Sequence, residues 1–343
     1  MRQTDAARRL LQLIDRFHQP QLVVFGDLIA DEFVYGRVAR MSREAPVLIL
    51  EYDSTEIVAG GAGNAANNAA ALGGRVRLIG LAGRDEAGRR LVSSLQSGVA
   101  RTGIVRPAGY GTPVKTRILA GGIHSAKQQV VRIDRRSDEI TDASRNAAER
   151  SVSRAVRQAD ALLVSDYGSG LVTPAFVQRL AAEARRRSRR PLRVLVDSRY
   201  ALTRYSRLTA CTPNESEVEH ALGIVIDDHP RVLERAGRTL LEKTKMEAVL
   251  ITRGSRGMAL FQSARPTVHI PIYGSDQIAD VTGAGDTVMA TMTLALAAGG
   301  TFEEAARLAN YAGGLVVMKR GTAIVTAREL RRAVESDGAR GAT

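Results

Sequence analysis

The chain has 343 residues, of which 44% are hydrophobic, so it can bury a large core as a single α/β domain with insertions. Its single cysteine, Cys211, excludes an intrachain disulfide and a thiolate metal cluster. The longest apolar stretch, near residues 288–298, is too short to span a bilayer, and residues 1–17 lack the apolar core of a signal peptide. We therefore expect a soluble cytoplasmic protein that does not bind membranes.

The formal net charge of +13 suits a nucleic acid, an anionic small molecule or only a basic surface. The densest basic run, residues 185–190, ends a helical pattern, where cations complement the helix dipole. No aromatic residue is interleaved with it. We interpret the run as a solvated helix end and expect no nucleic-acid partner. A steep salt dependence of DNA or RNA binding would indicate the opposite.

The first third of the chain alternates between α/β and β-rich patterns. Apolar spacing predicts a helix over residues 3–18 and a buried strand over 22–26, which ends at Asp27. Ligands of open α/β sheets bind at such strand ends, so Asp27 is a candidate to hold substrate hydroxyls, or else a turn residue. A strand over 75–81 and a helix over 86–97 follow.

Two stretches, about residues 33–58 and 113–134, place apolar residues between polar turns, which is typical of short antiparallel strands. They predict a small sheet set apart from the main one, inserted into a single domain that spans residues 1–343. This sheet would be a lid, a dimer interface or both. Because exposed strand edges need cover, we expect a homodimer formed through it.

Between these stretches, Gly60 and Gly61 precede an Ala-rich helix. Glycines let the backbone approach a ligand closely, and Asn64, in the first turns of the helix, can donate to and accept from a polyol. The alternative is an ordinary packing helix with a glycine entry.

From residue 142 onward the pattern is a steady alternation of strands and helices, which predicts a mostly parallel sheet with helices on both faces. Polar loops follow the strands, and that edge is the expected active-site edge. The expected helices cover 142–158, 174–188, 231–243, 303–318 and 327–336, and the expected strands cover 161–165, 193–196, 208–211, 248–252, 258–261 and 267–271.

The stretch from Asp280 to Thr287, DVTGAGDT, precedes an apolar helix over 288–298. Free N–H groups at a helix N-terminus attract anions, and glycines admit a bulky one. A carboxylate beside a bound phosphate suits a base that deprotonates an attacking hydroxyl, which makes Asp286 the candidate. The alternative is a tight helix entry that Asp286 only caps.

Four polar loops thus point to one edge: Gly60–Asn64, Asn214 with Glu217, Thr252–Gly254 and Gly283–Asp286. The chain has no Walker A motif and no protein-kinase loop set. With these motifs it resembles the PfkB (ribokinase-like) family of sugar kinases, over roughly residues 20–327. Within that family it is most similar to the heptose-7-phosphate kinases of ADP-heptose synthesis, through SREAPV at 42–47, SDYG at 165–168 and TPNESE at 212–217.

The resemblance implies a ribokinase-like fold, ATP and Mg²⁺ as cofactors, and a role for each matching residue. Asp286 is the expected general base, with an anion hole formed by the N–H groups of Gly283, Ala284 and Gly285. The expected sugar-binding residues are Asp27, Gly60, Gly61, Asn64, Asp166 and Arg199. The expected nucleotide-side residues are Asn214, Glu217, Thr252, Gly254, Gly257 and Asn310, with Glu217 ordering Mg²⁺ through water. Asp280, Thr282 and the backbone near Gly321 match a K⁺ loop of many members.

Many heptose kinases carry Asp-Pro-Lys where this chain has Asp197-Ser198-Arg199, which changes the geometry of the cation. Candidates to hold a distal substrate phosphate are Lys115, Arg117, Lys127, Arg132 and Arg199, each of which is equally interpretable as a surface charge. Bifunctional relatives carry a nucleotidyltransferase domain after the kinase, and we expect no such activity in a chain that ends at Thr343.

The favoured hypothesis is an ATP-dependent kinase that phosphorylates the anomeric hydroxyl of D-glycero-D-manno-heptose 7-phosphate. Its alternatives are a kinase for another sugar, phosphosugar or nucleoside, and a non-catalytic sugar- or nucleotide-binding relative. The intact Gly-Ala-Gly turn with Asp286 favours the enzyme.

Overall fold

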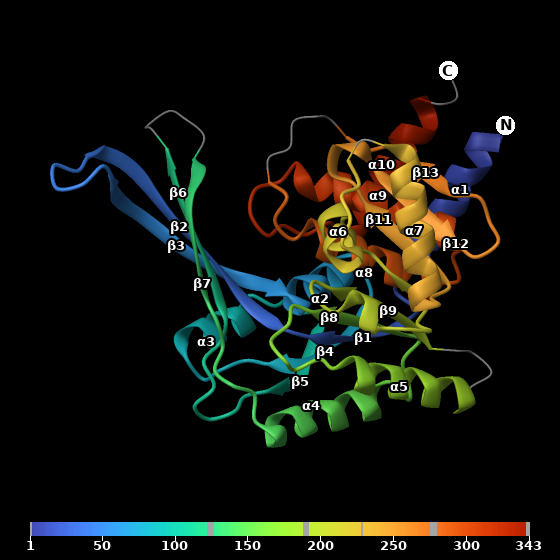
Figure 1. The fold of residues 1–343 in the computed structure, drawn as a ribbon, viewed down its shortest axis with the longest axis horizontal. Coiled ribbons are helices and arrows are strands. Elements are labelled where there is room, and N and C mark those ends of the chain that lie inside the picture. The colour runs from blue at the N-terminus through green and yellow to red at the C-terminus, as the bar shows by residue number, and fades with distance from the viewer. Residues whose placement is uncertain (1, 122–126, 188–191, 228, 275–279, 341–343) are drawn as a thin grey trace.

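The structure, a computed structural model, describes residues 2–121, 127–187, 192–227, 229–274 and 280–340. A nine-stranded sheet lies between two layers of helices, and a four-stranded sheet projects from one side of this body (Figure 1). The predicted α/β class, a mostly parallel sheet with helices on both faces and a small extra sheet, is confirmed.

The large sheet has the strand order β13-β12-β11-β10-β9-β8-β1-β4-β5. Its strands from β11 to β5 are parallel, and β12 and β13 extend it antiparallel at one edge. The bounds are β1 Gln21–Gly26, β4 Arg75–Leu81, β5 Val99–Val105, β8 Ala161–Asp166, β9 Arg193–Ser198, β10 Ala210–Cys211, β11 Ala248–Thr252, β12 Met258–Gln262 and β13 Val268–Ile270.

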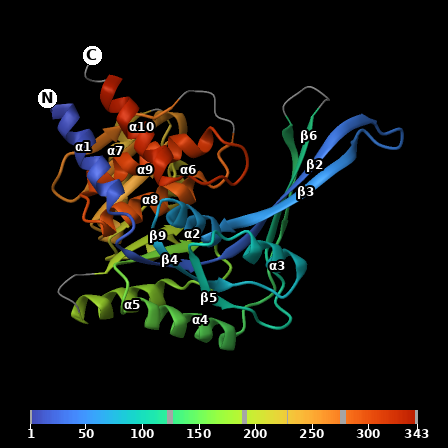
Figure 2. The same ribbon diagram turned by 180° about the vertical axis from the view of Figure 1, so that it is seen from behind.

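Apolar side chains point alternately to the two faces of the large sheet, so each face has its own hydrophobic core. In β1, Leu22 and Val24 face one helical layer while Val23 and Phe25 face the other, as the period of two in a strand requires. The first layer comprises α1 (Arg2–Asp15), α2 (Ala62–Ala71), α8 (Ala284–Ala297), α9 (Phe302–Val317) and α10 (Ala327–Arg340). The second comprises α4 (Asp142–Ala155), α5 (Pro174–Arg187), α6 (Glu215–Leu222) and α7 (Pro230–Thr244) (Figure 2).

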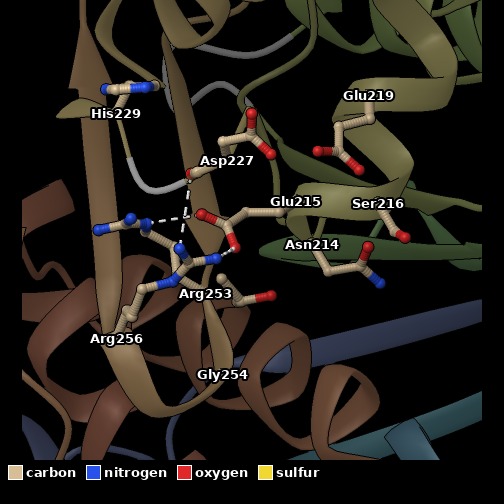
Figure 3. Close-up of a pocket in the computed structure, with 10 residues that line it drawn as sticks. Asn214, Glu215, Ser216, Glu219, Asp227, His229, Arg253, Gly254 and Arg256 are labelled. Atoms are coloured by element: carbon tan, nitrogen blue, oxygen red, sulfur yellow. Dashed lines mark hydrogen bonds and ion pairs between the residues drawn. The ribbon is translucent and has the colours of Figure 1, made fainter. Parts of the chain in front are cut away.

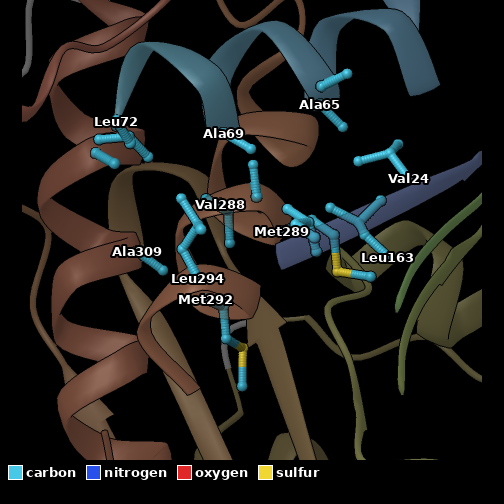
Figure 4. Close-up of a cluster of buried hydrophobic side chains, with 14 of the residues drawn as sticks. Val24, Ala65, Ala69, Leu72, Leu163, Val288, Met289, Met292, Leu294 and Ala309 are labelled. Atoms are coloured by element: carbon cyan, nitrogen blue, oxygen red, sulfur yellow. The ribbon is translucent and has the colours of Figure 1, made fainter. Parts of the chain in front are cut away.

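Helix α8 is buried on every side. Met289 and Leu294 pack among side chains of α2, α9 and the strands, including Ala65, Leu163 and Ala309 (Figure 4). Every residue from Asp286 to Leu296 is buried, as expected of a helix that is apolar all round. The first turn of α8 is thereby fixed at the carboxyl end of the parallel strands.

The small sheet has the order β3-β2-β6-β7, with β2 Leu28–Met41, β3 Leu48–Gly61, β6 Val114–Gly121 and β7 Gln128–Arg135. The prediction of short strands was wrong for β2 and β3, which are 14 residues each. Register shifts at Tyr35/Gly36 and Val38/Arg40 accommodate the polar positions without ending the strands. Because β2 begins two residues after β1 ends, the small sheet starts directly at the carboxyl end of the parallel strands (Figure 1).

The structure also describes the helix expected over 86–97, part of the basic run and Cys211. The helix expected over 86–97 is shorter, α3 Glu86–Ser93, because the Gln96 N–H donates to the Asn67 side chain at 2.8 Å instead of continuing the helix. In the basic run, Arg185 is exposed, and residues 188–190 lie outside the described residues. Cys211 is buried, and burial raises the pKa of its thiol, as suits a spectator residue.

Candidate active site

Asp286 lies in the first turn of α8 with only 4% of its surface exposed. Two side chains from other elements donate to its carboxylate. Asn64 Nδ2 in α2 donates to Oδ2 at 2.9 Å, and the Tyr167 hydroxyl, just after β8, donates to Oδ1 at 3.1 Å. Each carboxylate oxygen therefore has a fixed donor and a remaining acceptor site.

Burial raises the pKa of Asp286 to about 7. The Asn64 and Tyr167 hydrogen bonds and the Lys115 ammonium lower it, whereas the Asp31 carboxylate raises it further. A carboxylate that titrates near neutral pH is suited to accept a proton from a hydroxyl.

The turn before α8 has the shape of an anion site. Gly283 adopts φ 76° and ψ 6°, a left-handed conformation that favours glycine, and its carbonyl accepts from Asn64 Nδ2 at 3.2 Å. The Ala284 N–H is directed at the Val281 carbonyl at 3.2 Å, within the turn, while Gly285 is exposed at the helix N-terminus. Of the N–H groups expected to form an anion hole, that of Ala284 is thus bonded within the turn, whereas Gly285 is exposed.

The glycine pair forms the base of the small sheet. A Cβ at Gly60 would lie 2.2 Å from Asp31 Oδ2, so only glycine leaves room for that carboxylate. Gly61 has φ 55° and precedes α2 directly. Asp31 itself is 6% exposed and accepts from Arg117 at 2.6 Å and from the Thr322 hydroxyl at 3.2 Å.

A cavity of about 610 Å³ opens between the small sheet and the loop after β8. Lys115, Tyr167 and Arg199 line it together with Asp27. Asp27 is buried and accepts from the backbone N–H groups of Tyr167 (2.8 Å) and Ser169 (3.2 Å) and from the Ser169 hydroxyl. Burial raises the pKa of Asp27 to about 6 against those hydrogen bonds.

Asp166 lies on the other side of that loop. Its Oδ2 accepts from the Ser198 hydroxyl at 2.8 Å and from the buried Tyr205 hydroxyl at 2.7 Å. These bonds join β8 to β9 and to the segment after it. Arg199, which follows Ser198, is exposed, and its guanidinium carbon lies 5.9 Å from the centre of the Tyr200 ring.

A second, open cleft of about 940 Å³ lies at the start of α6 and the end of β11 (Figure 3). Asn214 caps α6 and forms a reciprocal capping box with Glu217, which holds the Asn-x-x-Glu segment rigid. Arg253 and Arg256 both pair with Glu215 across the cleft.

Two partly buried carboxylates, Asp197 and Glu217, lie within electrostatic range of Arg199. Burial and the nearby Glu217 raise the pKa of Asp197 well above its usual value, and burial raises the pKa of Glu217 as well. A Cβ at Gly285 would lie 4.0 Å from Asp197 Oδ2, so this carboxylate reaches the anion turn. A divalent cation with few protein ligands fits such a pair.

The remaining nucleotide-side residues lie around the same cleft or behind it. Thr252 forms an isolated bridge with Asn214, and Gly254 and Gly257 have φ 57° and 76° in the turn after β11. Asn310, in α9, donates to the Pro271 carbonyl at 2.9 Å and is 7% exposed. Asn310 therefore fixes α9 to the end of β13.

Asp280 connects the two loops of the expected K⁺ site. Its Oδ1 accepts from the Thr282 N–H at 2.8 Å and its Oδ2 from the Gly321 N–H at 3.1 Å. The three residues are thus together, beside the Gly283–Gly285 turn. Within the described part of the chain, no group of three or more His, Cys, Asp or Glu side chains has the arrangement of a metal site.

Residues 19–328 match the model of the pfkB family of carbohydrate kinases. The chain belongs to this family. None of the helices among the described residues is long and apolar enough to cross a membrane.

This pfkB-family chain is 42% identical to the bifunctional protein HldE of Geobacter sulfurreducens, over 90% of its own length and 61% of that relative. It is 39% identical to the bifunctional protein HldE of Caulobacter vibrioides, over 95% of its length and 66% of that relative. The chain therefore spans less than two thirds of these curated relatives.

Solved pfkB-like structures share the fold at low identity. Arabidopsis thaliana ribokinase, complexed with ribose and ATP, superposes with a TM-score of 0.70 at 20% identity, over 92% of this chain and 99% of that one. Escherichia coli phosphofructokinase-2, complexed with potassium, superposes with a TM-score of 0.71 at 18% identity, over 92% and 98%.

The structure adds residues to the site that the sequence analysis did not assign. Asp31 and Tyr167 contact the predicted residues directly, and Asp197 faces the anion turn. Asp31 was detectable because it stands with Glu32 in the apolar half of a strand that begins beside a predicted site residue. The direction of the Tyr167 hydroxyl had no signal in the sequence.

We predict that Asp286→Asn stabilises this chain at pH 8. The folded-state pKa of Asp286 is raised from 3.8 to about 7, so the folded state binds more protons than the unfolded state between these values, and stability falls as pH rises through them. The amide removes that penalty, for a gain of roughly 1–4 kcal/mol at pH 8 that shrinks towards pH 4. Urea unfolding at both pH values measures it.

Asp85→Asn is the matched control with the opposite sign. Burial disfavours the charged form of Asp85, but hydrogen bonds from Thr112 and Gly88 outweigh it and hold the pKa of this carboxyl below its usual value. That variant should lose stability at pH 8 and not at low pH. An Asp286→Asn protein that is less stable than wild type at pH 8 would contradict the raised pKa.

Proposed function

We propose that this protein is an ATP-dependent sugar kinase that transfers the γ-phosphate to the anomeric hydroxyl of D-glycero-D-manno-heptose 7-phosphate. One observation carries the reaction type: a buried carboxylate with a pKa near 7, Asp286, stands in the first turn of a buried helix beside a glycine turn. The similarity to HldE proteins over 90% of the chain supports the heptose phosphate as substrate.

In this proposal Asp286 takes the proton of the attacking hydroxyl, and the Gly283–Gly285 turn stabilises the transferring phosphoryl group. The sugar occupies the cavity lined by Asp27, Lys115 and Tyr167. Tyr167 also approaches Gly61, and Asn64 shares the Asp286 carboxylate with it. Phosphoryl transfer depends mainly on positioning and charge stabilisation, and these elements supply both.

ATP would occupy the cleft beside Asn214, Thr252 and Gly254. The residues present fit Mg²⁺, because burial raises the pKa values of the Asp197 and Glu217 carboxyls and the charge of Glu217 raises that of Asp197 further. Glu217 would hold the ion through water, and the ion would supply charge neutralisation for the phosphates. Asp280, Thr282 and Gly321 would form a K⁺ loop, since Asp280 already joins both segments.

We further propose that Lys115 and Arg199 recognise the distal phosphate of the sugar. Three of the five candidate cations are paired elsewhere: Arg117 with Asp31, Lys127 with Asp53 and Arg132 with Asp134. Among the described residues, Lys115 and Arg199 have no ion pair and both line the cavity. Burial lowers the pKa of Lys115, so a phosphate that paired with it would offset a desolvated charge.

We also propose that residues 1–343 form a single cytoplasmic domain, and that its small sheet is both a lid and the homodimer interface. The edge strand β7 is exposed along its whole length. Several large apolar side chains of this sheet are exposed, namely Met41 (55%), Tyr52 (67%), Val131 (47%) and Ile133 (54%). Such a surface favours association with a second copy.

The reaction is tested by ATP consumption with Mg²⁺ on heptose 7-phosphate, fructose 6-phosphate, fructose, ribose and adenosine. We expect turnover on the heptose phosphate alone, and a fall in turnover of at least ~10²–10⁴-fold in Asp286→Asn. We also expect turnover to fall when Na⁺ replaces K⁺ in the buffer. Turnover on another sugar, equally lost in the variant, would keep the mechanism and reject the substrate. Turnover that survives the variant would reject Asp286 as the base.

Lys115→Gln should lower kcat/KM for the phosphorylated sugar by about 10- to 100-fold, the worth of one hydrogen bond between charged groups. It should change turnover of the corresponding unphosphorylated sugar far less. Lys127→Gln, which removes a lysine already paired on the small sheet, is the matched control and should have little effect. Equal losses on both sugars would show that Lys115 does not recognise the phosphate.

The interface is tested by light scattering at micromolar concentration, where we expect a dimer. The double substitution Val131→Lys with Ile133→Lys places two charges on the small sheet and should give a monomer. Val225→Lys, at a residue that is 68% exposed outside both sheets, should remain dimeric. A monomeric wild-type protein would remove the proposal.

A further inference from the structure

Tyr167, which lines the cavity, contacts both Asp286 and Lys115. Its hydroxyl donates to Asp286 Oδ1 at 3.1 Å, and the Lys115 ammonium lies 4.5 Å from the centre of its ring. A Cβ at Gly61 would lie 3.5 Å from Cε2 of the same ring, so the ring also packs against the glycine pair. One side chain therefore lies between Asp286, Lys115 and Gly61.

The position of Tyr167 is set by a buried carboxylate on the neighbouring strand. Asp27, at the end of β1, accepts from the N–H groups of Tyr167 and Ser169 and from the Ser169 hydroxyl. Gly168 between them has φ 82°, which lets the loop turn tightly. Asp27 thus clamps the backbone on both sides of the turn, and the phenol projects from a fixed origin towards α8.

The phenol is a permanent donor. Burial raises the pKa of Tyr167 well above 10, and the Asp286 charge raises it further, so the hydroxyl keeps its proton wherever the base is ionised. With Asn64 on Oδ2 and Tyr167 on Oδ1, both oxygens of Asp286 are held from opposite sides. Two fixed donors define the plane of the carboxylate, and with it the direction of the lone pairs left for a hydroxyl proton.

We propose that Tyr167 is a positioning residue for the base: its hydroxyl orients the Asp286 carboxylate for proton transfer, and its ring supports the Lys115 ammonium. The inference rests on the proposed kinase function and adds a residue to it. A base held by Asn64 alone would keep one oxygen fixed and let the other rotate, so fewer bound substrates would meet a correctly directed lone pair.

The titratable groups that face Asp286 come from several elements. They are Asp31 from β2, Lys115 from β6, Tyr167 after β8 and Asp197 from β9. Tyr167 and Lys115 favour the ionised carboxylate, while Asp31 and Asp197 oppose it. Removing the phenol hydroxyl takes away one donor to the charged form, so the pKa of Asp286 rises, and the acid limb of the activity profile moves to higher pH.

Tyr167→Phe keeps the ring under Lys115 and removes only the hydroxyl. We expect kcat to fall by about 10- to 100-fold at pH 7, the worth of a hydrogen bond to a charged group, while the KM for ATP is unchanged. The acid limb of the kcat profile should shift upwards.

Tyr205→Phe is the matched control, because it removes the same kind of phenol–carboxylate bond from Asp166, on the far side of the loop. We expect it to lower thermal stability without moving the acid limb. A fall in kcat for Tyr167→Phe with an unmoved acid limb would reduce Tyr167 to a structural role and overturn the proposal.

A second readout does not need turnover. Carbon NMR of the labelled Asp carboxyls, with the Asp286 signal assigned by its loss in Asp286→Asn, follows this titration in the protein without substrates. A higher pKa for Asp286 in Tyr167→Phe, but not in Tyr205→Phe, supports the hydrogen bond even if no sugar is phosphorylated and the proposed function fails. An unchanged pKa overturns the inference even if the wild-type protein is an active kinase.

Discussion

The burial of α8 is the constraint on which the rest of the site depends. A helix that packs on every side against α2, α9 and the sheet cannot shift without opening the core, so the residues of its first turn occupy fixed positions. The same burial removes water from Asp286 and raises its pKa towards neutrality. Packing therefore sets both where the carboxylate stands and how readily it accepts a proton.

Asp286 is held by side chains that belong to other elements. Asn64 comes from α2, directly after the long strand β3, and Tyr167 comes from the loop that Asp27 clamps at the end of β1. Asp286 is thus connected to three separate segments at the carboxyl end of the parallel strands. Because β2 and β3 continue from that edge into the small sheet, a movement of this sheet would act on the glycine pair and on Asp31, which packs against Gly60.

Local rules in the sequence were sufficient for the scaffold and for part of the site. Alternating strands and helices predicted the parallel sheet, and Gly283 with its apolar continuation predicted α8. The sequence did not indicate which side chains would contact one another in the folded protein. The hydroxyl of Tyr167 bonds to Asp286, which is 119 positions away in the sequence. Arg117 is paired with Asp31 only because β6 lies beside β2 in the small sheet. The 14-residue strands were missed because their bulges disrupt the alternation that reveals strands.

The cations at the site differ in how much of their charge remains for a ligand. Arg117 is nearly buried with Asp31 at 2.6 Å, so its charge serves the attachment of β2 to β6. Lys115, two residues earlier on β6, lies over the Tyr167 ring and is attracted by the more distant charges of Asp31 and Asp286. These interactions do not outweigh its burial, which lowers its pKa. Lys115 and Arg117 lie on the same face of one strand, yet only Arg117 forms an ion pair with Asp31, which leaves Lys115 under-compensated. An anionic ligand gains most by binding an under-compensated, partly desolvated ammonium. The pairing of cations on β6, and not the net charge of the chain, is therefore the physical basis for proposing a phosphorylated substrate.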